Sequence, residues 1–352
     1  MFERVAGKVE LSPIDGYLIL HSENIKWLYN SSSYYVPGIT LVTADEVRLF
    51  TNVRSISSIR QAYPDLSVVK GGIESLAGYC AEKKLSRLGF ESNRTSVAEL
   101  DQISSKLPCE LVPMPDFVED LRMVKTPEEL AAIRVASSIA DSAYVEFLNH
   151  LRPGLTEIRA KNIFRQVLFN KGAEDLSFDI LLSSGQRTFL PHSIATDKVI
   201  NEGDLVLLDF GIVVGGYCSD TTRTVAIGYA TEQQEEVYNV VLHAQEAALR
   251  SIKAGMTCHQ ADAFARDVIM GRHPHGCYDY GLGHGIGISV HEKPRMGPQG
   301  DQLLLSNSVV SVEPGIYIEG WGGVRIEDLL VIGDLAPGMN LTGAPKELLI
   351  IS

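Results

Sequence analysis

The chain of 352 residues is long enough for two domains of ordinary size, each with its own hydrophobic core. Its formal net charge of −13 argues against sequence-independent binding of nucleic acid, which requires a basic surface. No apolar run approaches the ~18 residues that cross a bilayer, and the charged N-terminus does not resemble a secretion signal, so we expect no membrane association. The cysteines are odd in number and form no C-x-x-C pair, which favours free thiols in a reducing cytoplasm: Cys80, Cys109, Cys218, Cys258 and Cys277.

Residues 17–120 alternate short apolar runs with helical patterns, which predicts a mixed α/β domain. The predicted strands are "YLIL" (17–20), "ITLVTADEVRLFT" (39–51) and "LGF" (88–90), and the predicted helices are "ISSIRQAY" (56–63) and "SVAELDQISSKL" (96–107). A boundary follows at "RMVKTPEEL", where Thr126 can cap a helix, Pro127 fits its first position and Glu129 completes a capping box. We therefore divide the chain into residues 1–122 and 123–352.

The second part contains the same series of elements twice. Each copy has two helices, a loop with a histidine and a hairpin that carries acidic residues. The second copy begins with capping boxes at Thr231/Gln234 and Thr257/Gln260, the first of its helices ending near Gly255. Corresponding positions lie about a hundred residues apart: 126 and 231, 209 and 313, and 220 and 327. This predicts two halves related by a pseudo-twofold axis with a site between them, although common elements can also recur by coincidence.

The first hairpin, "LVLLDFGIVVGGYCSDTTRTV" (205–225), carries Asp209 within a strand that is apolar on both faces. A two-residue turn at Gly215-Gly216 pairs Asp209 with Thr222 and leaves Asp220 on the same face, diagonal to Asp209. Such neighbours lie about 7–8 Å apart at the backbone. Because a buried carboxylate without a partner costs several kcal/mol, a cation is expected between them.

The second hairpin, "VVSVEPGIYIEGWGGVRIEDLLVI" (309–332), has a similar arrangement. With a loop at 319–323, Gly315 lies opposite Glu327, and Glu313 shares the face of Glu327, again on a diagonal. Two further residues share that face: Tyr317 and Arg325. Two separate hairpins thus present paired acids on one side.

A third segment, "GLGHGIGISVHEKPR" (281–295), supplies a nitrogen ligand from His284, among glycines that let the backbone approach closely. Four carboxylates and one imidazole suit hard or borderline divalent ions such as Mn²⁺, Co²⁺ or Zn²⁺, of which Mn²⁺ and Co²⁺ are preferred here. Two ions would balance the four negative charges. The prediction is a dinuclear metal site at Asp209, Asp220, His284, Glu313 and Glu327.

Four motifs occur in an order that closely resembles the metallopeptidases of the methionine-aminopeptidase/prolidase superfamily: "DFG…YCSDTTRT", "GLGHGIGISVHE", "VEPGIY" and "GGVRIED". The resemblance runs from about residue 125 to the end of the chain. It implies an α+β fold class, with a pita-bread catalytic domain and its pseudo-twofold repeat over 123–352. Residues 1–122 resemble the smaller creatinase-type N-terminal α/β domain of prolidases and aminopeptidases P.

The resemblance also implies a role for each metal ligand. Asp209 would chelate one ion, His284 and Glu313 the other, and Asp220 and Glu327 would bridge the two. Glu313 would in addition accept a proton from the bridging water as it attacks the scissile carbonyl.

Further residues match substrate-binding positions of the family. His291, in "VHE", would hydrogen-bond the substrate and the tetrahedral oxyanion. His192, in "LPHSIATDK", matches a second substrate-binding histidine or is a surface loop residue, and it is followed by Ser193 where such enzymes commonly have glycine. Arg295 matches an arginine that in prolidases binds the carboxylate of a dipeptide. Tyr317 is a further substrate-binding candidate; it and Arg325 either support the metal ligands by hydrogen bonds or only pack.

The function implied is hydrolysis of Xaa-Pro bonds by a cytoplasmic, homodimeric metallopeptidase that acts on small peptides with proline in second position. Arg295 favours dipeptides as substrates. The alternative is an aminopeptidase P, which releases the first residue from longer peptides. A creatinase-like hydrolase or a binding protein without metal is disfavoured, because the full ligand set is present, and the domain before residue 120 argues against a methionine aminopeptidase.

Overall fold

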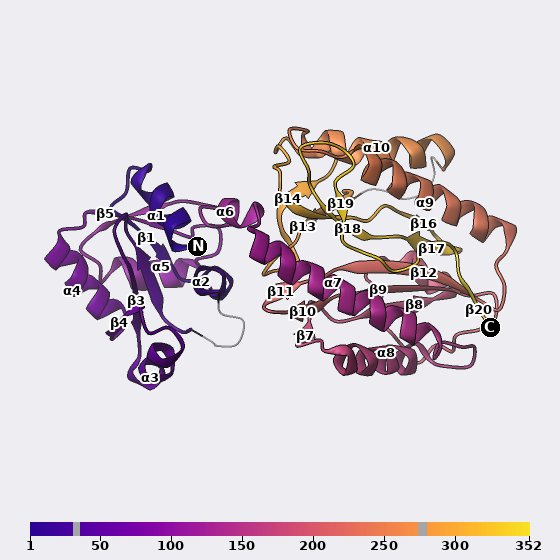
Figure 1. Cartoon of the computed structure of the whole chain (residues 1–352), viewed down its shortest axis with the longest axis horizontal. Coiled ribbons are helices and arrows are strands. Elements are labelled where there is room, and N and C mark those ends of the chain that lie inside the picture. Colours follow the sequence, from indigo (N-terminus) through magenta and orange to yellow (C-terminus); the bar gives the residue numbers. More distant parts are fainter. Residues whose placement is uncertain (31–35, 274–279) are drawn as a thin grey trace. The chain divides into compact units, whose positions relative to one another are not determined.

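The computed structural model describes residues 1–30, 36–273 and 280–352, so Cys277 lies outside the described residues. The chain divides into two compact units, Met1–Arg122 and Met123–Ser352 (Figure 1). Within the described ranges, no helix has the length and apolar character needed to cross a membrane.

The first unit is a mixed six-stranded sheet with helices, in the strand order β4-β3-β2-β1-β5-β6. The predicted strands and both predicted helices are present, and the long apolar run at 39–51 forms two antiparallel strands rather than one. The elements in chain order are α1 (Phe2–Glu10), β1 (Gly16–Ile19), α2 (Ser22–Tyr29), β2 (Ile39–Val42), β3 (Val47–Thr51), α3 (Val53–Ala62), β4 (Ser67–Lys70), α4 (Ile73–Lys83), β5 (Arg87–Phe90), α5 (Val97–Ser104), β6 (Glu110–Pro113) and α6 (Glu119–Met123).

The second unit begins its helices where capping residues predict them. The side chains of the N-cap residues accept the backbone N–H three positions on, and three of the four helices have a full capping box. The N-cap residues are Thr126, Thr156, Thr231 and Thr257. The third helix ends at Ser251, before the predicted stop near Gly255, because Ile252 already has extended backbone angles.

The elements of the second unit follow in chain order. They are α7 (Pro127–Leu148), α8 (Glu157–Lys171), β7 (Asp175–Leu176), β8 (Leu181–Ser184), the 3₁₀ turn η1 (Gly185–Phe189), β9 (Leu205–Phe210), β10 (Ile212–Val214), β11 (Tyr217–Cys218), β12 (Thr221–Ile227), α9 (Glu232–Ser251), α10 (Cys258–Arg272), β13 (Gly283–Gly285), β14 (Glu292–Met296), β15 (Val309–Val312), β16 (Gly315–Ile318), β17 (Gly322–Arg325), β18 (Asp328–Val331), β19 (Met339–Asn340) and β20 (Ile350–Ile351).

Each half of the second unit packs one helix pair on its own strands. Helices α7 and α8 form a core with β8, β9 and β12, whereas α9 and α10 form a separate core with strands of the second hairpin. In Figure 1 the α9–α10 pair lies above the strands and α8 lies below them. The strands that carry the acidic residues therefore lie between the two helix layers.

The first hairpin has the predicted register. Val214 pairs with Tyr217 and Asp209 with Thr222. Gly215 and Gly216 both have positive φ, 58° and 81°, which the two-residue turn that matches strand twist requires.

The second hairpin is shifted by two residues from the predicted register, so the predicted loop at 319–323 is wrong. Ile318 pairs with Gly322, which leaves a loop of only 319–321, and Gly320 supplies the left-handed residue of the turn with φ 77°. Gly323 belongs to β17, where a Cβ would lie 2.5 Å from the carbonyl oxygen of Thr188. This glycine is thus required by close packing rather than by the loop.

A shift of two residues keeps every side chain on its face. Gly315 pairs with Arg325, and Val312 pairs with Asp328 in the same register. Glu313 therefore lies directly opposite Glu327 instead of on a diagonal, and both acids still share one face.

Candidate active site

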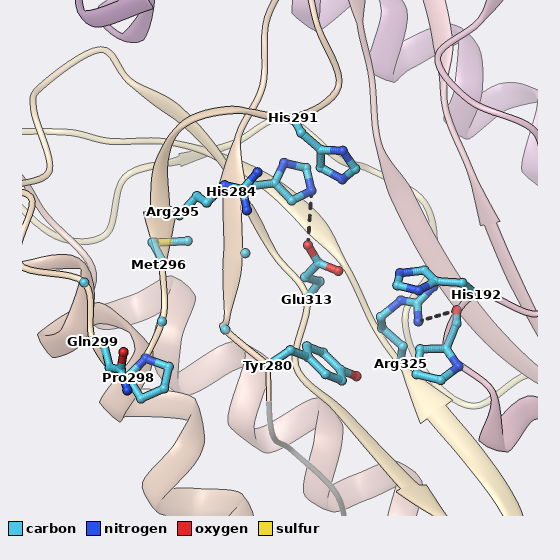
Figure 2. A pocket seen from close by; sticks show the side chains of 15 residues that line it. His192, Tyr280, His284, His291, Arg295, Met296, Pro298, Gln299, Glu313 and Arg325 are labelled. Carbon is cyan, nitrogen blue, oxygen red and sulfur yellow. Dashed lines mark hydrogen bonds and ion pairs between the residues drawn. The ribbon is translucent and has the colours of Figure 1, made fainter. Parts of the chain in front are cut away.

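A cavity of about 830 Å³ opens in the second unit, a volume within the range of small-ligand sites (Figure 2). Its wall combines titratable side chains from the second hairpin, from the segment around β13 and β14, and from the loop between η1 and β9. They include His192, Tyr280, His284, His291, Arg295, Glu313 and Arg325.

His284 lies at the centre of the acidic residues. Its Nε2 is 3.2 Å from Glu313 Oε1, the contact drawn in Figure 2, and 3.6 Å from Asp220 Oδ2. One ligand atom each from Asp220, His284 and Glu327 lies within 4.8 Å of the others. The structure thus brings acids from both hairpins and the predicted histidine to one place.

The two hairpins are joined through Thr222 and Glu327. The backbone N–H of Glu327 donates to the carbonyl oxygen of Thr222 at 3.1 Å, and the Thr222 hydroxyl donates to Glu327 Oε2 at 2.7 Å. Since Thr222 is also the strand partner of Asp209, this contact places Asp209 of β9 beside Glu327, which follows β17.

Arg325 connects a predicted ligand to the cavity wall. It is buried and donates to four oxygen atoms: Asp209 Oδ2 at 2.6 Å, Thr222 Oγ1 at 3.0 Å, the Tyr317 hydroxyl at 2.6 Å and the Pro191 carbonyl at 3.2 Å. Arg325 therefore does more than pack. Tyr317 is buried behind the wall, with its ring centroid 5.7 Å from that of Tyr280.

The positively charged side chains near the buried acids are too few to balance the negative charge of those acids. Burial and the neighbouring carboxylates raise the pKa values of Asp220 and Glu327 well above their usual range. Burial also raises the pKa of Asp209, against the opposing effect of Arg325. Only the pKa of Glu313 is lowered among these acids, because the hydrogen bond and charge of His284 outweigh its burial.

The same residues fit divalent metal ions. Asp209 Oδ1 and Glu327 Oε1 are buried and have no hydrogen-bond partner among the described residues, which is costly unless a cation binds them. Carboxylate oxygens with one imidazole nitrogen are the donors that hard or borderline divalent ions prefer.

The predicted substrate-binding residues lie around this cluster. The His291 ring contacts the His284 ring edge-on, with centroids 4.3 Å apart, and desolvation together with His284 lowers the pKa of His291. Arg295 lies exposed on β14, opposite His284 in the strand pairing. In the view of Figure 2, Glu313 lies between Arg295 and His192.

Two polar residues of the site were not singled out from the sequence. Ser311 donates its hydroxyl to Glu313 Oε1 at 2.9 Å and accepts the backbone N–H of His284 at 3.0 Å. Ser311 precedes Glu313 by two positions, so strand alternation alone would have placed it on the same face. Tyr280, by contrast, has no sequence signal and lines the cavity from the segment before β13.

Two family models match the chain. The model of the Creatinase/Prolidase N-terminal domain matches residues 2–124, and that of metallopeptidase family M24 matches residues 131–334. The chain belongs to metallopeptidase family M24. The α+β fold class with a creatinase-type domain before a pita-bread domain is thereby confirmed, and membership of this family implies divalent metal ions.

This M24 peptidase resembles several Xaa-Pro peptidases over almost their whole length. It is 34% identical to the Xaa-Pro dipeptidase of Pyrococcus furiosus over 99% of both chains. A solved Xaa-Pro dipeptidase from Bacillus anthracis matches with a TM-score of 0.92 and 35% identity, over 99% of this chain and 98% of the other. The X-Pro aminopeptidase from Thermotoga maritima matches with a TM-score of 0.89 and 34% identity, over 98% and 100%.

Proposed function

We propose that this peptidase hydrolyses the peptide bond that precedes proline, with Xaa-Pro dipeptides as its main substrates. The observation that carries the proposal is one cavity whose wall holds His192, His291 and Arg295 together with His284 and Glu313. His284 in turn lies beside the buried acids Asp220 and Glu327. The relatives named Xaa-Pro dipeptidase, similar over nearly the whole chain, support the substrate class.

We propose two divalent ions, Mn²⁺ or Co²⁺ in preference to Zn²⁺, at the residues named from the sequence: Asp209, Asp220, His284, Glu313 and Glu327. When bound, such ions lower the pKa of a water molecule and polarise the substrate carbonyl. Support comes from the unpaired oxygens of Asp209 and Glu327 and from the charge balance of four carboxylates.

The side chains of the cavity perform the remaining steps. The Glu313 carboxylate accepts the proton of the attacking water, and the Ser311 hydroxyl holds this carboxylate in place. The lowered pKa of His291 keeps its ring neutral near pH 7, with one N–H to donate. His291 and His192 donate to the carbonyl oxygen as it gains negative charge during the attack.

Arg295 selects substrate length in this proposal. Its guanidinium pairs with the carboxylate of a dipeptide, which a tripeptide carries one residue further out. Arg295→Ala should reduce kcat/KM on an Xaa-Pro dipeptide by about 10–150-fold, or roughly 1.5–3 kcal/mol, and much less on Xaa-Pro-Xaa. Both substrates are measured at saturating metal, with Arg250→Ala, an exposed arginine on α9, as the control.

Release of the first residue from longer peptides remains the second candidate. The resemblance to a solved X-Pro aminopeptidase favours it. An equal loss on both substrates in Arg295→Ala would support this candidate over the dipeptidase. If metal reconstitution gave activity on neither the dipeptide nor the tripeptide, both candidate functions would be refuted.

The homodimer expected from the family is also a proposal. Light scattering on the purified chain would measure its mass against the 38.5 kDa of one copy.

A further inference from the structure

The segment that carries His192 is fixed at both ends. Before it, the carbonyl oxygen of Pro191 accepts from Arg325 at 3.2 Å. After it, the backbone N–H and the hydroxyl of Thr196 both donate to Glu157 Oε2, each at 2.9 Å. These bonds leave open how the residues directly after His192 are held.

Arg187, in η1, holds the residues directly after His192. Its Nη2 donates to the Ser193 hydroxyl at 2.9 Å and to the Ile194 carbonyl oxygen at 2.7 Å. Ser193 is buried, and its own N–H donates to the Leu190 carbonyl oxygen at 3.1 Å, so the segment folds back upon itself beside His192. A glycine at this position would offer Arg187 no hydroxyl.

Glu157 holds Arg187 in turn. This carboxylate is fully buried at the start of α8 and accepts the Arg187 Nε at 3.2 and 3.3 Å. It also accepts the N–H and the hydroxyl of Ser184, at 2.8 and 2.9 Å, in addition to the two bonds from Thr196. A planar guanidinium bound to such a fixed carboxylate has one orientation and presents its other nitrogen in a defined direction.

We propose that Arg187 is a positioning residue for His192, acting through the Ser193 hydroxyl and the Ile194 carbonyl. The inference rests on the proposed function, in which His192 contacts the substrate carbonyl. Arg325 binds the backbone on one side of His192 and Arg187 binds the segment on the other, so the ring enters the cavity from a backbone that is hydrogen-bonded on both sides. Displacement of a catalytic group by about 1 Å can cost on the order of 100-fold in rate.

The test uses Arg187→Lys and Ser193→Ala, each alone and combined with His192→Ala. Arg187→Lys keeps the positive charge beside Glu157 but loses the planar guanidinium that binds Glu157 and the His192 segment at once. It should lower kcat/KM on an Xaa-Pro dipeptide by about 10–100-fold. Ser193→Ala removes one bond and should lower it by about 3–10-fold. In the His192→Ala background neither change should have a further effect, because a positioning residue acts only through its target. Losses that add to that of His192→Ala would overturn the inference.

Hydrogen exchange supplies a readout that does not depend on activity. The amides of Ser193 and Thr196 are hydrogen-bonded and should exchange faster in Arg187→Lys, whereas Arg250→Lys, in an exposed pair on α9, should leave them unchanged. If the wild type has no Xaa-Pro activity, the proposed function fails and this measurement alone decides whether Arg187 holds the segment. Unchanged exchange would then overturn the inference. If Arg187→Lys does not fold, Ser193→Ala is used in its place, both for kcat/KM with and without His192→Ala and for hydrogen exchange of the same amides.

Discussion

Replacing Arg223 by methionine should destabilise the second unit strongly. Arg223 is 1% exposed on β12 and donates hydrogen bonds to five oxygen atoms. These are the carbonyl oxygens of Pro345 at 2.9 Å, Thr222 at 2.9 Å, Glu327 at 2.6 Å and Ala344 at 2.8 Å, and Asp328 Oδ1 at 2.7 Å. One guanidinium thus ties β12 to the strand after Glu327 and to the C-terminal segment.

The magnitude follows from what the substitution leaves behind. Methionine fills part of the volume but leaves Asp328 buried, with its other oxygen still bound by Lys346 and Asn340 at 2.9 Å each. Removing one partner of a buried ion pair costs about 3–5 kcal/mol. A domain of this size loses about 2–4 °C in Tm for each kcal/mol, so the expected decrease is about 6–20 °C.

Differential scanning calorimetry at pH 7 measures this decrease. Arg250→Met is the matched control, because Arg250 pairs with Glu246 at 3.1 Å on the exposed face of α9, where an ion pair contributes little. Its Tm should fall by at most about 3 °C. If Arg223→Met lowered Tm no more than this control, the reasoning about buried ion pairs in this fold would be refuted.

Three further predictions concern pH, a second ion pair and the metal. Burial favours protonation of Asp328, but the charges of Arg223 and Lys346 outweigh burial and lower the pKa of Asp328 in the folded protein. The charged carboxylate therefore stabilises the fold above the unfolded pKa, and this contribution is lost as the pH falls below about 4. The Tm difference between wild type and Asp328→Asn should therefore shrink from pH 7 to pH 3; a constant difference would contradict this. Lys125→Met removes the cation that lies 3.4 Å from the buried carboxylate of Glu292, and should lower Tm by about 6–20 °C. Because Glu292 follows His291, the substitution should also reduce kcat/KM. Unchanged kinetics would show that the ion pair does not position His291. A chelator should abolish activity and lower Tm, and Mn²⁺ should restore both, because bound cations relieve the repulsion between the buried acids. Full activity in a metal-free sample, verified by elemental analysis, would contradict this prediction.

Local chemistry made much of this fold predictable from the sequence. Thr126 and Thr231 begin their helices because a threonine hydroxyl three positions before Glu or Gln satisfies the first backbone N–H groups without help from distant residues. Gly215-Gly216 predicts the first hairpin from local chemistry as well, since a two-residue turn with positive φ at both positions favours glycine there. Strand alternation then places each acid on its face.

Tertiary packing decided the rest. Whether a glycine makes a turn or admits a neighbour cannot be read from the segment alone: Gly320 turns the second hairpin, while Gly323 is packed against Thr188, and the loop was therefore predicted two residues too long. The charged pairs around the site join residues that are distant in sequence, such as Arg325 with Asp209 and Lys125 with Glu292. No periodicity encodes such partners, because a buried charge binds whichever opposite charge the assembled core brings within reach.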